Sequence, residues 1–238
     1  MIRRKKTLGT CRYCGRELTK SGMTKHLKVC PDRLETQAEA NRGHEPSLPV
    51  YHLLVQDLLE SDYWLHLEMR GDATLEDLDF YLRAIWLECC GHLSSFWIDP
   101  NLHTQLFDDV MGLGNERPMD PQVQTLFRPG MKIPYDYDFG TTSRLLIKVL
   151  YETTKKPISA NPIELMARNI APEFNCQYCD EAANNLCLEC QIESGLSGFL
   201  CELHEAEHDC YGYGDPAPLV NSPRVGMCAY IGPAEPPY

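Results

Sequence analysis

An α+β fold, built as a compact mixed domain of antiparallel strands and a capped helix, is predicted by three patterns in this 238-residue sequence. Apolar and polar residues alternate over residues 63–70, as in a strand with one buried face. A helical stripe of apolar residues follows Thr74. Residues 131–154 read as a β-hairpin, because two runs rich in aromatic and β-branched residues flank a turn at Gly140. Strands and a helix in this order favour an α+β domain.

The predicted helix begins at Thr74, a good N-cap residue, and Asp77 stands three positions later in a variant of the capping box. A strand is expected over residues 92–99, and residues 161–169 fit a strand or a helix. The helical stripe is interpreted as core packing, and it consists of Leu75, Leu78, Leu82, Ile85 and Trp86.

Composition and charge are those of a globular protein with one unusual end. With 43% hydrophobic and 24% charged residues, most of the chain is expected to fold around a core. No apolar run approaches the ~18 residues of a membrane span, and no secretory segment follows the basic start, so we expect a cytoplasmic protein without a membrane partner.

The net charge is +8 over residues 1–30, −10 over residues 31–172 and −10 over residues 173–238. This asymmetry indicates a head that faces a polyanion or, equally, a solubilising tail.

Nine of the twelve cysteines stand in two clusters with histidines at the spacing of metal ligands. In a reducing compartment such clusters are typical of zinc sites. The first cluster gives one tetrahedral Cys3His set, with Leu18 and Met23 as a small apolar core. It resembles a Cys2His2 zinc finger whose last histidine is replaced by cysteine. Its ligands are Cys11, Cys14, His26 and Cys30.

This finger is predicted to bind DNA or RNA weakly and without sequence preference, with protein contact as the alternative. Gly22 would take the central base-reading position, and it has no side chain that reaches a base. Contacts are therefore expected at phosphates. The candidate contact residues are Arg3, Arg4, Lys5, Lys6, Lys20, Lys25 and Lys28.

The second cluster offers eight ligands, enough for two tetrahedral zinc ions. Alternating ligand pairs predict a cross-brace, and sequential pairing is the alternative. In the cross-brace, one ion is held by Cys176, Cys179, Cys201 and His204, and the other by Cys187, Cys190, His208 and Cys210. The ligand order resembles that of B-box and AN1-type fingers, which implies protein binding. Because each set is closed, we predict three structural zinc ions per chain.

The remaining cysteines and several histidines receive no metal. Cys89 and Cys90 lie in an apolar stretch and are expected to be buried structural cysteines. Cys228 is assigned no role. The histidines regarded as isolated are His44, His52, His66 and His103. The predicted organisation is a zinc finger (1–35), a polar linker (36–49), an α+β domain (50–172), a double-zinc module (173–215) and a Pro/Gly-rich tail (216–238).

Three stretches of the middle domain carry a family resemblance: residues 74–86, residues 91–98 and the YDYDFG motif at 135–140. Over about residues 51–151 the chain resembles the plasmid pRiA4b Orf-three-like domain family, also described as the TnpR-like passenger protein of an insertion element. The sequence departs at Asp79, where the family usually has His, and after Gly140, where the family's Trp is missing. The resemblance implies a compact α+β domain associated with mobile genetic elements, and it carries over no reaction.

We interpret the chain as a zinc-binding adaptor whose basic head contacts nucleic acid and whose acidic C-terminal module contacts a protein. The alternative is a metal-dependent hydrolase or nucleic-acid-processing enzyme on the YDYDFG face. There Asp136 and Asp138, two apart in a strand, would point to one face with His92 nearby. A structural interpretation competes with this enzyme: the aspartates would accept hydrogen bonds from turn amides.

Overall fold

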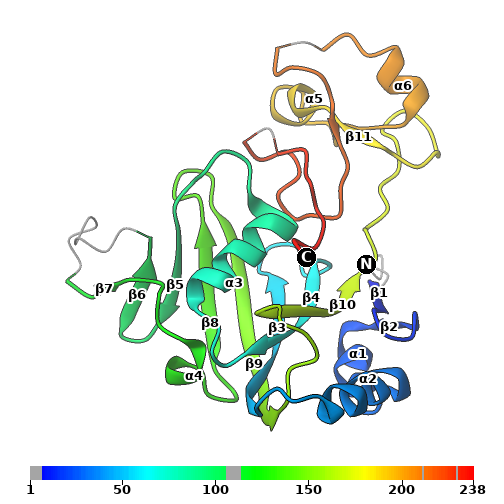
Figure 1. Cartoon of the computed structure of the whole chain (residues 1–238). Helices are drawn as coiled ribbons and strands as arrows, with labels where there is room; N and C mark the ends of the chain where they lie inside the picture. Colours follow the sequence, from blue (N-terminus) through cyan, green and yellow to red (C-terminus); the bar gives the residue numbers. More distant parts are fainter. Residues whose placement is uncertain (1–6, 106–113, 211, 229) are drawn as a thin grey trace.

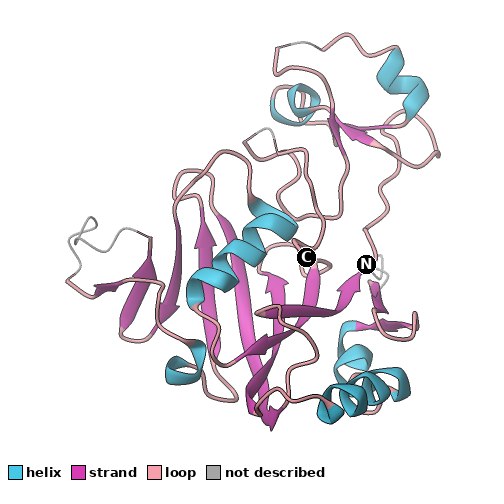
Figure 2. Ribbon diagram, viewed as in Figure 1, coloured by secondary structure: helices cyan, strands magenta, loops and turns pink. Residues whose placement is uncertain are grey.

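The computed structural model describes residues 7–105, 114–210, 212–228 and 230–238, which form a mixed α+β fold (Figures 1 and 2). The strands of its large sheet are β1 (Leu8–Cys11), β2 (Glu17–Thr19), β3 (Leu48–Asp57), β4 (Trp64–Arg70), β5 (Ser94–Ile98), β6 (Asn101–Thr104), β7 (Glu116–Arg117), β8 (Lys132–Tyr137), β9 (Ser143–Lys155) and β10 (Ile163–Asn169). Their order is β2-β1-β10-β4-β3-β9-β8-β5-β6-β7, antiparallel throughout except between β6 and β7. The predicted fold class is confirmed.

Helix α3 (Leu75–Leu82) begins at the predicted cap and covers one face of this sheet (Figure 1). The Thr74 hydroxyl accepts from the Asp77 N–H at 3.1 Å, and the Asp77 carboxylate accepts from the Thr74 N–H at 2.8 Å. The helix continues into one turn of π-helix, η1 (Arg83–Leu87). All five stripe residues are buried, and they pack against strand residues such as Leu53, Leu65, Leu67 and Ile147. This cluster is the main core, whose burial drives folding of the body.

The predicted strands lie in the centre of the sheet. Residues 63–70 contain β4, and residues 131–154 contain the β8–β9 hairpin. Residues 161–169, which fitted a strand or a helix, contain strand β10, paired with both β1 and β4. The short helix α4 (Val123–Leu126) packs Val123 into the main core.

The N-terminal finger is part of the sheet. Strand β1 pairs with β10, and Gly9 lies so close to the Trp64 ring that a Cβ at this position would clash with it. Met23 of helix α1 (Lys20–His26) and the C-cap residue Leu27 pack against Trp64 on the face opposite α3. The predicted apolar pair of the finger is present, but its core is shared with the body.

The prediction of a linker over residues 36–49 is wrong for most of this range. Helix α2 (Pro31–Arg42) covers its first half, and β3 begins at Leu48. Proline at the first helical position and Asp32 in the first turn favour this helix start. None of the helix residues is fully buried, and the sequence of the helix has no apolar stripe that would predict it. It is held instead by Arg33, which donates to the buried Glu68 carboxylate at 2.8 Å.

Residues 173–210 form a small lobe above the body, and the tail returns from it (Figure 1). The lobe contains β11 (Asn185–Leu186), α5 (Leu188–Ile192), β12 (Phe199–Leu200) and α6 (Glu202–Ala206). Strand β13 (Ala217–Pro218) completes a sheet ordered β12-β11-β13. The expected tail over residues 216–238 is therefore integral to the fold: Tyr230 is buried, and the Ser222 hydroxyl donates to the Trp86 carbonyl at 2.6 Å. Within the described residues, no helix has the length and apolar character needed to cross a membrane.

Two histidines regarded as isolated lie together under α1. His52 Nε2 and His66 Nδ1 are 2.7 Å apart on neighbouring strands, and both rings are buried. Burial lowers the pKa of both imidazoles, and for His52 the neighbouring His66 ring adds to the effect. The pair is therefore neutral in the folded protein, which is a structural arrangement rather than a metal site. A third such residue, His103, contacts the Pro118 carbonyl at 2.9 Å.

Acidification is expected to destabilise the fold through this pair. Because the folded pKa values lie below the unfolded value of ~6.5, the unfolded state takes up protons first as the pH falls. The contribution of the pair to the free energy of unfolding is thus fully present above pH ~6.5. Below this pH it falls by up to ~1.4 kcal/mol per pH unit for each ring. Urea unfolding between pH 7 and pH 5 checks this, with a His52→Gln/His66→Gln variant whose stability should fall less steeply. Equal slopes for the two proteins would contradict the prediction.

Candidate metal centres

All twelve cysteines of the chain fall into four groups of identical composition, each with three cysteines and one histidine. Within every group the four ligand atoms lie within 4.8 Å of one another, so each can hold a metal ion. A Cys3His set is compatible with tetrahedral Zn²⁺. The sequence predicts three of these groups.

The first group lies where the finger meets the sheet. Cys11 ends β1, Cys14 lies in the following turn, His26 ends α1 and Cys30 is the N-cap of α2. Cys14 Sγ is 3.2 Å from His26 Nε2, and the Sγ atoms of Cys11 and Cys30 are 4.0 Å apart. Burial raises the pKa of the Cys11 thiol, and a bound cation would offset that cost by stabilising the thiolate.

The second and third groups share the small lobe and follow the predicted cross-brace. One gathers Cys176, Cys179, Cys201 and His204; the other gathers Cys187, Cys190, His208 and Cys210. His204 Nδ1 lies 3.2 Å from Cys201 Sγ, and His208 Nε2 lies 3.5 Å from Cys190 Sγ. The sequential alternative does not fit these groups.

Short elements position these ligands. Cys187 is the N-cap of α5, where its Sγ accepts from the Cys190 N–H at 3.4 Å, and Cys201 is the N-cap of α6. Burial alone would raise the pKa of Cys176, but hydrogen bonds to its sulfur, including one from the Tyr178 N–H at 3.5 Å, outweigh burial and lower it to about 6. The sulfur is thus prepared to be a thiolate, the form that binds metal.

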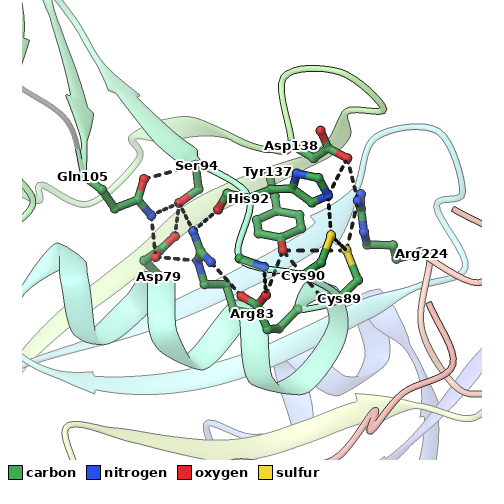
Figure 3. Close-up of polar contacts among 12 residues, drawn as sticks. Asp79, Arg83, Cys89, Cys90, His92, Ser94, Gln105, Tyr137, Asp138 and Arg224 are labelled. Atoms are coloured by element: carbon green, nitrogen blue, oxygen red, sulfur yellow. Dashed lines mark hydrogen bonds and ion pairs between the residues drawn. The ribbon is translucent and has the colours of Figure 1, made fainter. Parts of the chain in front are cut away.

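The fourth group corrects the expectation that Cys89 and Cys90 are buried structural cysteines. Cys89 is partly exposed and Cys90 is exposed, and both join His92 and the exposed Cys228 in one cluster. Figure 3 shows Cys89, Cys90 and His92 of this cluster. His92 Nε2 lies 3.0 Å from Cys90 Sγ and 3.3 Å from Cys228 Sγ. Sequence reasoning missed this set because Cys228 is 136 residues from His92, although the Cys-Cys-x-His spacing and one leftover cysteine were signals.

The YDYDFG face does not gather the three residues proposed for an enzyme. Asp138, at φ 64°, follows β8 and accepts from the Gly140 N–H at 3.0 Å and from Arg224 at 2.7 Å. Its carboxylate also lies 3.4 Å from His92 Nε2. Asp136 instead faces Arg144 on β9 at 3.9 Å, in a more exposed ion pair. Asp138 thus serves the turn, as the structural interpretation expected.

A second polar cluster beside this motif is centred on Asp79 (Figure 3). Its buried carboxylate accepts hydrogen bonds from Tyr135 at 2.7 Å, Arg83 at 2.8 Å and Gln105 at 2.9 Å, and from the Ser94 hydroxyl. The carboxylate is therefore fully engaged within the protein and ties α3 to the sheet.

Some of the basic residues of the finger contact other parts of the protein, and others are exposed. Lys20 donates to the Gln56 side chain at 3.3 Å and to the Ser61 carbonyl at 3.2 Å, and Lys28 lies over the Tyr151 ring at 5.1 Å. Lys25 is exposed. Arg3, Arg4, Lys5 and Lys6 lie outside the described residues. Lys28 is exposed as well, so Lys25 and Lys28 are the described candidates that a phosphate could reach.

A cavity of about 980 Å³ lies where the small lobe, the finger and the tail meet. Apolar side chains from all three line it, and Phe174 stacks on Phe199 with ring centroids 4.2 Å apart. Four carboxylates also line it: Glu17, Glu60, Asp62 and Glu173. Lysine and arginine are absent from its described lining. The cavity is therefore apolar and acidic.

Comparisons with known proteins do not identify a function for this chain. No family model matches the chain, and no curated protein matches it. A solved structure of a protein of unknown function from Methanosarcina mazei Go1 is similar, with a TM-score of 0.41 and 16% sequence identity over 52% of this chain and 69% of that chain. The metal clusters and the cavity are therefore the features from which function is inferred.

Proposed function

We propose that this chain is a zinc-binding adaptor whose acidic cavity takes a basic, partly apolar segment of a partner protein. Zn²⁺ in the three predicted groups would hold the finger and the small lobe in shape. The observation that carries the proposal is the cavity, because it is formed jointly by the finger, the lobe and the tail. Metal that orders these parts would therefore also build the binding surface. The Orf-three-like family membership and its mobile-element association remain a separate proposal of the sequence.

Closed ligand sets support a binding role for the metal. Each of the three groups supplies four protein ligands, so a tetrahedral zinc there would keep no open position for substrate. Three thiolates and one neutral imidazole around Zn²⁺ carry a net charge of about −1, which adds to the acidity of the lobe.

Charge and shape support the class of partner. The cavity combines a stacked aromatic pair with the carboxylates of Glu17 and Glu173, so lysine or arginine side chains of a partner would be attracted there while its apolar side chains are buried. Complementary charge selects partners and speeds association more than it adds affinity. A nucleic acid would be repelled by the same carboxylates.

Selection of random dodecapeptides displayed on phage, with the zinc-loaded full chain as bait, tests this function. The enriched peptides should carry basic residues beside apolar ones. A Glu17→Lys/Glu173→Lys variant should weaken their binding about tenfold or more, because two attractive charges become repulsive. The matched control is Glu35→Lys/Glu39→Lys on the exposed face of α2, with the same change in net charge. An equal loss in both variants, or enrichment of acidic peptides, would reject the cavity as the site.

A single-stranded oligonucleotide is the second probe in the same titration. Nucleic-acid contact through residues 1–35 predicts binding that weakens steeply with salt and is reduced by Lys25→Glu. Binding of this kind without any selected peptide would favour the nucleic-acid partner over the protein partner.

A further inference from the structure

We propose that Cys89, Cys90, His92 and Cys228 bind a fourth Zn²⁺ ion, which is accessible to solvent and fastens the C-terminal segment to the body. The group has the same composition as the other three, and its four ligand atoms meet the same distance limit. With this group included, every cysteine in the chain is a ligand of a Cys3His set. Three ions, as the sequence predicts, would leave three clustered thiols without a role.

The backbone supports convergence of these ligands on one point. Cys228 has φ 50°, a left-handed conformation that is uncommon for a residue other than glycine. Such a conformation persists where surrounding structure imposes it and is frequent at functional sites. It places the Cys228 sulfur 3.6 Å from Cys90 Sγ, in a segment distant in sequence.

A buried arginine supports a charged centre at this place. Arg224 has no exposed surface, and its Nη2 lies 3.5 Å from Cys89 Sγ and 2.7 Å from the Asp138 carboxylate. The Tyr137 hydroxyl lies 3.9 Å from Cys89 Sγ (Figure 3). A zinc ion with three thiolates carries a net negative charge, and a guanidinium that donates to one of the sulfurs stabilises it, as outer partners of metal ligands do.

Exposure separates this site from the other three. Each of those groups contains two buried cysteines, whereas here Cys90 and Cys228 are exposed. A competing chelator therefore reaches this ion first. Because the ion joins the loop after η1 to the tail, it also fixes residues 222–227, several of which line the acidic cavity.

Native mass spectrometry of the full chain, purified with zinc under reducing conditions, tests the inference. The wild-type protein should carry four zinc ions, and Cys228→Ser and His92→Ala should each carry three. The matched control is His44→Ala, an exposed histidine outside all four groups, which should keep four. Cys90→Ser serves as the second variant if Cys228→Ser fails to fold.

Two further readouts distinguish the fourth ion from the others. A metallochromic chelator should remove one zinc in a separate, faster phase that is missing in Cys228→Ser. Hydrogen exchange should increase over residues 222–228 in this variant while β11 and β12 keep their protection. Three zinc ions in the wild-type protein, a Cys90–Cys228 disulfide in place of the metal, or four ions in Cys228→Ser would overturn the inference. A single release phase would overturn the accessibility of the site. Failure of the peptide selection would leave each of these outcomes unchanged.

Discussion

Chelation of bound metal is expected to unfold the small lobe, residues 173–210, while the large sheet stays folded. The buried apolar side chains of the lobe are mostly its own cysteine ligands, joined by Leu186 and Leu200. Burying a leucine contributes ~1.5–3 kcal/mol. Two buried leucines cannot offset the conformational entropy that is lost when the lobe becomes ordered. Structural zinc contributes an apparent ~10–16 kcal/mol per site, which makes the metal the main source of stability here.

Hydrogen exchange with a strong chelator measures this effect. Amides of β11 and β12 should lose protection together, and those of β3 and β4 in the main core should keep it. Cys187→Ser, which removes one ligand, should reproduce part of the loss without chelator. Ser194→Ala, an exposed change in the same lobe, should have no effect. Persistent protection of β11 after measured loss of all metal would show that the lobe folds without it.

The finger should lose less structure on chelation, because strand pairing and apolar packing stabilise it in addition to the metal. Strand β1 is paired with β10, and Met23 and Leu27 pack against Trp64 of the body. We therefore expect disorder around Cys14 and His26, while the pairing of Gly9 with Asn169 persists.

The sequence predicted those features that depend on residues close together in the chain. The capping box at Thr74 and the strand around Leu67 follow from short-range rules, and both are present. Alternating ligand pairs predicted a cross-brace in the small lobe and left sequential pairing open, and the two groups in the structure match the cross-brace.

Features that depend on contacts between distant parts of the chain could not be predicted from the sequence. Helix α2 is held by a salt bridge from Arg33 to Glu68 on β4 and has no apolar stripe that would have announced it. His52 and His66 meet because their strands are neighbours, which spacing in sequence does not reveal. The fourth cluster requires the tail to return to the loop after η1, so Cys228 had no visible partner.

Replacement of Arg224 by leucine is expected to cost ~3–5 kcal/mol of folding stability, the effect of leaving a buried charge without its partner. Arg224 is fully buried, and it donates to Asp138 at 2.7 Å, to Ser143 at 2.9 Å and to the Thr141 carbonyl at 3.1 Å. Burial alone would raise the pKa of Asp138, but the hydrogen bonds from Arg224 and the Gly140 N–H outweigh it and hold that pKa below its usual range. Asp138 is therefore charged at neutral pH and needs the guanidinium.

A double-mutant cycle separates the charge effect from lost packing. Asp138→Asn/Arg224→Leu should be more stable than Arg224→Leu alone, because both buried charges are removed together while asparagine tolerates the left-handed backbone at position 138. The matched control is Asp136→Asn, which breaks the more exposed pair with Arg144 and should cost less than ~1 kcal/mol. Zinc counted in each variant shows whether the neighbouring cluster is affected. If Arg224→Leu unfolds at the same urea concentration as Asp136→Asn, the buried pair does not hold the tail, and packing around Tyr230 and Ser222 must do so instead.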